Sequence, residues 1–403
     1  MRFTILTQYY PPEVGAPQAR LAALARALQQ RGHSVHVVTA MPNYPSGVVQ
    51  PAYRGRWWMR ECIEGIPVTR TWIYPATGRN VLKRLANYFS FTLSSLFDLA
   101  RVPRADVLFV ESPPLFLCLS AWLAAALRRQ ELCINISDLW PDSVVALGIM
   151  HDGSFVKVAR WLERWLYRHA WRVCGVTEGV VRGIIIKGIP ADKVMFLPNG
   201  VDTRLFQPTP LRRTKDRPYQ FVYAGTHGYA HGVEVILYAA SRLQKRGDIQ
   251  FVLVGDGADK LRLQNLAVDL KLQNIVFRES IPIALMPALL AESYAALVTV
   301  AGGTFFDGTR SAKIFPAMAA GRAILHSGAG EGADLVRQSR SGIVTPPHDA
   351  EALAEAVVRL ADSPGEAEAM GRRGREFVQR EYSWPIVVDR WLNALGIEDA
   401  SKR

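Results

Sequence analysis

One stretch of the sequence, residues 302–336, combines basic side chains, glycine-rich turns and an apolar segment. Arg310 and Lys313 lie directly before or at the start of the apolar segment, which is predicted to form a short helix. Ser311 is predicted to be the N-cap of that helix, because its hydroxyl can accept from backbone amides two or three residues later. A helix that begins beside two cations suits a phosphate group. The alternative is an ordinary α/β unit whose basic turn is solvated.

The segments around this stretch predict an α/β fold. Short apolar runs at residues 3–6, 106–110 and 221–224 are typical of buried strands, and residues 18–30 and 350–360 have the apolar spacing of helices. Strands that alternate with helices indicate doubly wound, parallel sheets. In such sheets ligands bind beyond the carboxyl ends of the strands, so the loops that follow the predicted strands are the candidate sites.

Polar residues follow two predicted strands in the first half of the chain. Glu13 and Arg20 are candidates for binding a ligand at this edge, and Gly15 would let the backbone approach that ligand closely. Asp138 follows the strand predicted at residues 132–137, where functional residues often lie. Asp138 could instead cap a local helix, and both interpretations remain open.

The length of 403 residues predicts two domains. The polar segment 208–218 begins and ends with proline, which is typical of a linker. We therefore expect one domain at residues 1–207 and a second at residues 208–383. The basic charge is concentrated in the first half, where residues 1–205 hold 24 Lys and Arg against 14 Asp and Glu, leaving 24 against 22 for the rest.

A basic, tryptophan-rich first half favours an anionic partner, and no nucleic-acid-binding motif is present, so we expect a membrane surface rather than a nucleic acid. Residues 81–104 form an amphipathic segment with interleaved basic residues. Such a helix can lie in a membrane interface, or it can face the core with a solvated basic side.

Other features predict a cytoplasmic protein that is peripheral to the membrane. The four cysteines lack metal or redox spacing and are expected to be free thiols in a reducing compartment. The chain starts on a strand pattern without an apolar signal segment. The most apolar run, residues 115–127, is shorter than the roughly 20 residues that a membrane-spanning helix needs.

Five motifs occur in a characteristic order, QYYPPEVGAPQ, MPNYPSG, ESPP, SDLWPDS and PNGVD. In this order and at these intervals they resemble retaining glycosyltransferases of the GT4 type, and among these the WbuB-like group of O-antigen and exopolysaccharide enzymes. The resemblance covers nearly the whole chain. It implies a GT-B architecture of two facing Rossmann-like domains, with an acceptor on the first and a nucleotide sugar on the second. It also implies that residues 384–403 cross back to the first domain.

The resemblance assigns expected roles to individual residues. The donor diphosphate would contact His227 and Gly228, where related enzymes carry Arg and Lys, and would receive charge from Arg310 and Lys313. Gly330, Glu331 and Asp334 lie in the glycine loop that faces the donor, although Asp334 could simply be an acid in the first turn of a helix. Glu13, Arg20 and Asp138 would hold the acceptor, with Asp138 and Lys313 closest to the chemistry. The donor-binding set is Gly15, His227, Gly228, Arg310, Ser311, Lys313, Gly330, Glu331 and Asp334.

The sequence departs from the family pattern at two positions. GT4 enzymes carry two glutamates seven residues apart, and the matching positions here are Gly308 and Pro316. The second glutamate usually accepts hydrogen bonds from the donor ribose, so Pro316 removes that acceptor. A proline in the first turn of a helix is still compatible with the helix itself.

The sequence therefore predicts a hexosyltransferase that uses a nucleoside diphosphate sugar, expected to be UDP-linked, with retention and without a metal or other cofactor. The expected acceptor is a saccharide carried on a lipid such as a polyprenyl diphosphate, in surface-polysaccharide assembly. One alternative is a GT-B protein that has lost transfer activity and serves as the partner of an active transferase. The other is a nucleotide-sugar epimerase.

Overall fold

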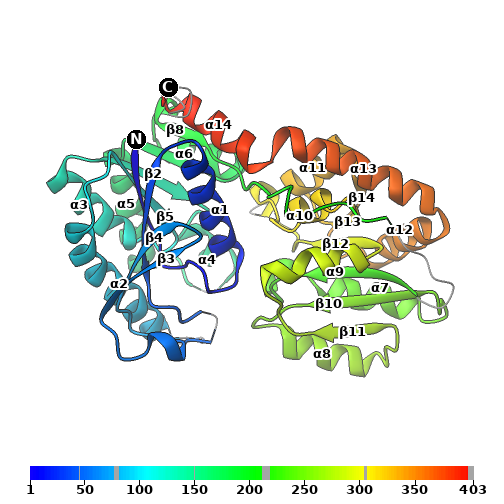
Figure 1. The fold of residues 1–403 in the computed structure, drawn as a ribbon. Helices are drawn as coiled ribbons and strands as arrows, with labels where there is room; N and C mark the ends of the chain where they lie inside the picture. The colour runs from blue at the N-terminus through cyan, green and yellow to red at the C-terminus, as the bar shows by residue number, and fades with distance from the viewer. Residues whose placement is uncertain (45, 77–80, 149, 211–217, 304–305, 398–403) are drawn as a thin grey trace. The chain divides into compact units, whose positions relative to one another are not determined.

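The computed structural model describes residues 1–403 except 45, 77–80, 149, 211–217, 304–305 and 398–403. The chain forms two compact units (Figure 1). The first unit contains Met1–Pro198 together with Trp384–Arg403, and the second contains Asn199–Ser383.

The first unit is built on a sheet that has eight strands among the described residues, in the order β3-β4-β2-β1-β5-β6-β7-β8. All neighbouring strands are parallel except β3, which runs antiparallel to β4 at the edge. The strands are β1 Arg2–Leu6, β2 Ser34–Ala40, β3 Trp58–Ile63, β4 Ile66–Thr71, β5 Val107–Ser112, β6 Glu131–Ile136, β7 Arg172–Gly175 and β8 Val194–Phe196. The helices of this unit are α1 Ala16–Gln30, α2 Val81–Arg101, α3 Leu117–Arg128, α4 Asp142–Ala146, α5 Ser154–His169, α6 Glu178–Ile186 and α14 Trp384–Ala394.

The second unit has a parallel sheet with six described strands in the order β11-β10-β9-β12-β13-β14. The strands are β9 Tyr219–Ala224, β10 Ile249–Val254, β11 Ile275–Arg278, β12 Ala295–Thr299, β13 Ala323–Ser327 and β14 Gly342–Thr345. Its helices are α7 Glu234–Arg242, α8 Lys260–Asp269, α9 Met286–Glu292, α10 Ile314–Ala319, α11 Gly330–Ser339, α12 Ala350–Asp362 and α13 Pro364–Glu381. This is the doubly wound strand order of a Rossmann-like domain. The chain adds β10 and β11 on one side of β9 and then β12, β13 and β14 on the other side, so the strand order reverses between β9 and β12.

The last helix, α14, packs in the core of the first unit, although the whole second unit separates the two in the sequence. Trp391 is 1% exposed and contacts Phe3 and Phe109, with ring centroids 6.3 and 5.7 Å away. Its indole Nε1 donates to Cys174 Sγ at 3.3 Å. On the exposed side of the helix, Asp389 pairs with Arg31, the C-cap residue of α1, at 2.5 Å. The predicted return of the chain to the first domain is thus confirmed.

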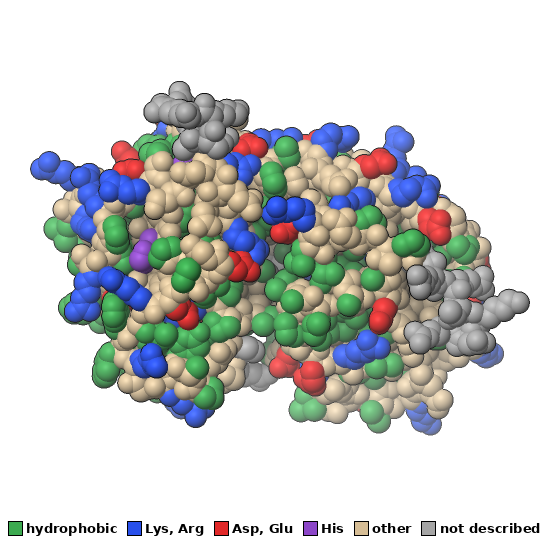
Figure 2. Space-filling model, viewed as in Figure 1, with side chains coloured by type: hydrophobic (Ala, Val, Ile, Leu, Met, Phe, Trp, Pro, Cys, Tyr) green, Lys and Arg blue, Asp and Glu red, His purple; other side chains and the backbone are tan. Residues whose placement is uncertain are grey.

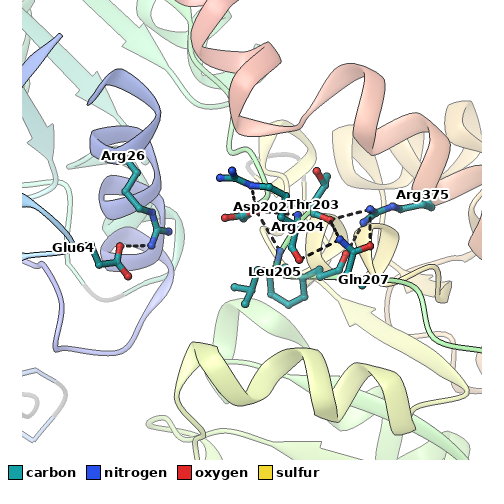
Figure 3. A network of polar contacts seen from close by, with 9 residues as sticks. Arg26, Glu64, Asp202, Thr203, Arg204, Leu205, Gln207 and Arg375 are labelled. Carbon is teal, nitrogen blue, oxygen red and sulfur yellow. Dashed lines mark hydrogen bonds and ion pairs between the residues drawn. The ribbon is translucent and has the colours of Figure 1, made fainter. Parts of the chain in front are cut away.

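The boundary between the units differs from the prediction. The chain leaves the first unit after Pro198, nine residues before the expected boundary at residue 207. Residues 199–207 belong to the second unit because Val201 and Phe206 are buried in its core. Arg375 of α13 holds this segment by donating from Nη2 to the Thr203 carbonyl at 2.9 Å (Figure 3). Of the predicted linker at residues 208–218, residues 211–217 lie outside the described part of the chain.

Most predicted elements are present, but β3 was not expected. Its residues alternate between exposed and partly buried along the sheet edge. An edge strand with charged residues at Arg60 and Glu61 lacks the continuous apolar run that identifies buried strands.

Candidate active site

The candidate donor site lies at the carboxyl edge of the second sheet. Glycines follow two of its neighbouring strands, at Gly225 after β9 and Gly255 after β10. Ala301 and Gly302 follow β12, and the glycine loop before α11 follows β13. The sheet order reverses between β9 and β12, so this edge is the position where ligands bind in doubly wound sheets.

The side chain of Lys313 lies at the carboxyl edge of the second sheet, where the strand order reverses. It comes from the connection between β12 and β13, yet its side chain lies against the loop after β9. A Cβ atom added to Gly225 would lie 2.1 Å from Lys313 Cε and 3.0 Å from Nζ, so only glycine leaves room for the lysine there. The ammonium lies 5.0 Å from the centroid of the Tyr223 ring. The position of the Lys313 side chain is therefore set by Tyr223 of β9 and by Gly225 directly after it.

The electrostatic state of Lys313 is unusual. Burial of the ammonium lowers the pKa of Lys313 to about 8. Within the described residues, no carboxylate forms an ion pair with it. Lys313 is partly buried, and a desolvated cation without an anion is costly unless a ligand supplies the negative charge, so this lysine is the strongest candidate for binding a phosphate.

Helix α11 adds a second group of phosphate-binding donors. Its N-cap is Ala329, and no side chain caps its first-turn amides. The amides at the N-terminus of a helix are a common binding site for an anion. Gly330, at φ +69°, opens the helix, and a Cβ atom there would lie 2.0 Å from the Asp307 carbonyl oxygen, so the close approach requires glycine.

The glycine loop before α11 is wrapped around a buried histidine. His326 is fully buried, and added Cβ atoms at Gly328 and Gly332 would lie 2.8 and 2.7 Å from its ring. Neither ring nitrogen has a hydrogen-bond partner within the described residues. Burial lowers the pKa of His326 to about 4, so the ring is neutral at pH 7. This support for the loop was not predicted from the sequence, and the signal was the histidine at the end of a strand followed by three glycines at alternate positions.

Two predicted donor-binding residues, Arg310 and Ser311, lie close to Lys313 in the sequence. The guanidinium of Arg310, whose residue is 9% exposed, lies 5.3 and 5.1 Å from the ring centroids of Phe315 and Tyr382, and its Nη1 donates to the Tyr382 hydroxyl at 3.2 Å. Arg310 thus packs on aromatic rings of this unit, and its contact with a diphosphate stays a prediction. Ser311 is not the N-cap, because α10 begins later and its N-cap is Lys313. Pro316 is the third residue of α10, where a proline is tolerated.

The other predicted donor-binding residues of the second unit lie in the loop after β9 and in α11. His227 is fully buried beside the Tyr223 ring, with centroids 5.7 Å apart, and burial lowers the pKa of His227 to about 4. Its ring packs within the loop after β9, and its contact with the donor stays a prediction. A Cβ atom added to Gly228 would make only ordinary van der Waals contacts, and this residue opens the turn Tyr229–His231. Glu331 lies partly buried in the first turn of α11. Asp334 is exposed and pairs with Arg337 at 2.9 Å. It lies beyond the first turn of α11, whose acidic residue is Glu331, so the alternative of a first-turn acid is wrong.

At the carboxyl edge of the first sheet, the predicted acceptor residues are engaged by the protein. Glu13 is 4% exposed and accepts from the amides of Asn43 at 2.7 Å and Tyr44 at 2.8 Å. Burial raises the pKa of Glu13 to about 7, although these amides favour the ionised form. Glu13 therefore links its own loop to the loop at Asn43 and Tyr44, and its role in acceptor binding stays a prediction. Gly15 is the N-cap of α1, and the only close contact of an added Cβ atom there is the flexible Gln18 side chain.

Arg20 is also committed to the fold. Its guanidinium forms a buried ion pair with Glu111 at the end of β5. The other carboxylate oxygen of Glu111 accepts from Asn135 Nδ2 at 2.8 Å. The three residues link α1, β5 and β6, and the binding of an acceptor by Arg20 stays a prediction.

Asp138 is the predicted acceptor residue whose environment is least restricted. It follows β6 and is partly buried. Burial raises the pKa of Asp138, and hydrogen bonds from the Ser143 side chain and the Leu139 amide, together with the charge of Lys187, oppose that change. Lys187 itself pairs with Asp142 at 2.7 Å and with Glu163 at 2.5 Å. This network holds the loop that carries Asp138 against α5 and α6.

Comparisons with known proteins agree with this architecture. Residues 15–200 match the family described as the glycosyl transferase 4-like domain, and residues 218–363 match glycosyl transferases group 1. The chain is 30% identical over 305 residues to the putative colanic acid biosynthesis glycosyl transferase WcaI of Escherichia coli, and the match covers 72% of this chain and 74% of that protein. The chain belongs to the GT4-type glycosyltransferases.

Solved structures extend the similarity of this glycosyltransferase at the level of the fold. Sucrose-phosphate synthase from Thermosynechococcus elongatus aligns with a TM-score of 0.76 at 18% identity, covering 98% of each chain. Anabaena HepE in complex with UDP and glucose aligns with a TM-score of 0.73 at 15% identity, covering 98% of this chain and 99% of that one. These neighbours have the GT-B fold, and so does this glycosyltransferase.

The family membership supports a nucleotide-sugar donor and a role in polysaccharide or glycolipid biosynthesis. Within the described ranges, no helix is both long and apolar enough to span a bilayer. The same residues contain no cluster of three or more His, Cys, Asp or Glu with the arrangement of a metal site.

Proposed function

We propose that this GT4-type glycosyltransferase transfers a hexosyl residue from a uridine diphosphate sugar to a lipid-linked saccharide, with retention at the anomeric carbon. The observation that carries the donor half is Lys313, a cation without an anionic partner in the described structure at the reversal point of the second sheet. The uncapped amides of α11 lie on the loop after β13 at the same sheet edge. Together they support a diphosphate between the loop after β9 and the start of α11.

The proposed reaction needs charge stabilisation more than it needs a general base. The bond between the anomeric carbon and the phosphate oxygen breaks, and a bond to the acceptor hydroxyl oxygen forms on the same face. The proton of the acceptor hydroxyl passes to the departing diphosphate. Negative charge grows on that diphosphate in the transition state, where Lys313 would neutralise it without a metal ion. Asp138 would orient the acceptor.

The acceptor half of the proposal is supported by the relatives. WcaI is described as a colanic acid biosynthesis enzyme. A second relative, 26% identical over 225 residues, is the GDP-mannose-dependent α-(1-6)-phosphatidylinositol monomannoside mannosyltransferase of Mycobacterium tuberculosis, and the match covers 53% of this chain and 58% of that protein. Both names concern surface glycans or glycolipids, which supports a cytoplasmic enzyme working at the membrane on a lipid-linked acceptor.

The donor proposal is tested by thermal unfolding with nucleotides. UDP should raise the Tm of the wild-type protein, and Lys313→Ala should abolish the rise, because the substitution removes the charge that binds the diphosphate. Lys245→Ala is the matched control, since this exposed lysine of the same unit should leave the rise unchanged. No shift with UDP, GDP or dTDP would refute the donor proposal.

A second candidate is a GT-B protein that has lost transfer activity and acts as a partner of an active transferase. Its support is the absence of a carboxylate at both Gly308 and Pro316. An active enzyme should release free nucleotide slowly from its donor without acceptor, in an amount reduced by Lys313→Ala. Binding of UDP without any such release from a panel of nucleotide sugars would favour the partner role.

A further inference from the structure

Helix α2 presents an apolar face to the outside of the first unit. Leu82, Phe89, Leu93 and Phe97 are 76, 41, 62 and 68% exposed. They are spaced seven, four and four residues apart, which puts them on one side of a helix. We call these four residues the α2 ridge. Monomeric proteins rarely expose a contiguous apolar surface of this kind without a binding partner.

The side of α2 that faces the protein is partly polar. Three polar and two apolar side chains of the helix are no more than 4% exposed, namely Asn87, Ser95, Asp98, Phe91 and Leu99. Asn87 Nδ2 donates to the Tyr74 carbonyl at 2.7 Å, and Ser95 bonds to the Ser120 hydroxyl of α3 at 3.1 Å. A helix on a protein surface normally turns its apolar stripe inward and its polar side outward. Helix α2 instead docks partly through hydrogen bonds and leaves much of its apolar surface outside.

Tryptophans lie beside the α2 ridge. Trp57 is 72% exposed and stacks on Trp72, with ring centroids 5.1 Å apart. Ser94 of α2 donates to the Trp72 carbonyl at 2.6 Å, which fixes the pair next to the helix. Tryptophan is enriched at the interface between lipid and water, where its apolar ring and polar N–H meet both environments.

The segment that carries the α2 ridge has exposed cations and no exposed carboxylate among its described residues. Between Glu64 and Asp106 the sequence has one acidic residue, Asp98, and that side chain is buried. Four exposed basic residues lie on α2 or directly after it, namely Lys83, Arg84, Arg101 and Arg104. On the face of the first unit seen in Figure 2, Lys and Arg side chains are interspersed with hydrophobic ones. An apolar strip within a stretch of chain that is rich in cations and poor in carboxylates complements an anionic lipid surface.

The α2 ridge is connected to the edge of the sheet where the acceptor is proposed to bind. Asn87 Oδ1 accepts from Gln8 Nε2 at 2.8 Å, and Gln8 follows the carboxyl end of β1. Phe89 packs on Phe116, with centroids 4.4 Å apart, and Phe116 packs on Trp140 at 5.7 Å. Trp140 is two residues from Asp138. A continuous line of aromatic rings thus leads from the ridge to the loop that carries the acceptor candidate.

We propose that the α2 ridge, together with Trp57, inserts into the headgroup region of an anionic phospholipid bilayer. The inference rests on the proposed function, because it explains how a lipid-linked saccharide reaches Asp138 while its lipid stays in the membrane. The exposed cations on and directly after α2 favour an anionic lipid surface over a protein partner. A protein partner would need matching carboxylates along the whole helix.

The test is co-sedimentation of the full chain with vesicles of phosphatidylcholine, with or without about one-third phosphatidylglycerol. Wild-type protein should bind the anionic vesicles at least about tenfold more strongly than the neutral ones. The double variant Leu93→Ser/Phe97→Ser should lose at least about tenfold of that binding, because two apolar side chains no longer enter the interface. The matched control is Leu261→Ser/Val268→Ser on α8, since these residues are 70 and 74% exposed in the second unit.

Binding of the double variant equal to that of the wild type overturns the proposal, as does an absence of wild-type binding to anionic vesicles. Light scattering adds a further outcome. A wild-type dimer that the double variant converts to a monomer would overturn the proposal, because a second copy would then cover the ridge. The rise in Tm with UDP is measured on the same proteins, and it depends on residues of the second unit. A rise in Tm with UDP that is retained in the double variant shows that this variant is folded. Absence of that rise in the wild type counts against the proposed donor site and not against the membrane role of the α2 ridge.

Discussion

The carboxyl edges of the two sheets treat their charged side chains in opposite ways. In the first unit the candidates are satisfied internally, Glu13 by backbone amides and Arg20 by a buried pair with Glu111. In the second unit Lys313 lies close to a neutral glycine and a tyrosine ring, with no anion paired to it in the described structure. Both edges carry a candidate cation. Arg20 at the first edge pairs with the Glu111 carboxylate, whereas Lys313 at the second edge has no anionic partner among the described residues.

This difference indicates what each edge is built to bind. A partly buried, desolvated cation without an anion lowers stability, and it is useful only where a ligand supplies the opposite charge. Internally paired charges cost less, and they fix loop geometry without attracting ions. We therefore expect the second edge to bind its ligand mainly through charge, and the first to bind through hydrogen bonds and apolar contact.

The largest expected effect comes from breaking the internal pairing of the first edge. Arg20→Met leaves the Glu111 carboxylate buried beside Asn135 without its cation. The free energy of unfolding should fall by about 3–5 kcal/mol, as is typical when one partner of a buried ion pair is removed. Urea unfolding measures the change.

The double variant Arg20→Met/Glu111→Leu provides the control for that experiment. It removes both charges, so it should recover a large part of the lost free energy of unfolding. If Arg20→Met alone is as stable as the wild type, the pair is not what holds the first edge together.

The contact between the β9 loop and Lys313 is tested next. Gly225→Ala places a methyl group where Lys313 Cε now lies, so the ammonium must move. The affinity for UDP should fall by about tenfold to a hundredfold, or about 1.4–2.7 kcal/mol, measured by calorimetry. Gly247→Ala is the matched control, because an added Cβ atom there meets nothing within 4 Å and the affinity should not change. Equal affinities for both variants would mean that the diphosphate does not need this lysine position.

The smallest expected effect is a dependence of UDP affinity on pH. Because burial holds the pKa of Lys313 at about 8, the free protein loses this cation as the pH rises through that value. The affinity should be constant below about pH 7 and about tenfold weaker at about pH 9, since one pH unit above a pKa leaves about a tenth of the group charged. Lys313→Arg, which stays protonated, should remove the decline. An affinity that does not change over this range in the wild type would contradict the assigned charge state.

Several features of the fold could be predicted because they depend on local patterns. The apolar run at β5 and the helical periodicity of α2 identify those elements, and the glycines after β9 and β13 mark ligand-binding turns. The outward apolar face of α2 could not be predicted, because periodicity shows that one side is apolar and not which side faces the core. That choice depends on hydrogen bonds such as Asn87 with Gln8, which join residues far apart in the sequence.

The site was predicted less completely for a related reason. Arg310 and Lys313 are three residues apart and of the same charge, yet one packs on aromatic rings and the other reaches the β9 loop. The sequence contains no local signal that separates these two environments. Ser311 was predicted to cap a helix that begins later, because Lys313 takes the N-cap position.

The position of α14 has a consequence for how the protein is made. Phe3 and Phe109 belong to the first half of the chain, but the tryptophan that packs between them and Cys174 is Trp391. On a ribosome, the first unit therefore stays without part of its core until nearly the whole polypeptide has been synthesised. The second unit is one continuous segment and has all of its described strands earlier. The half that begins synthesis first is the half that is completed last.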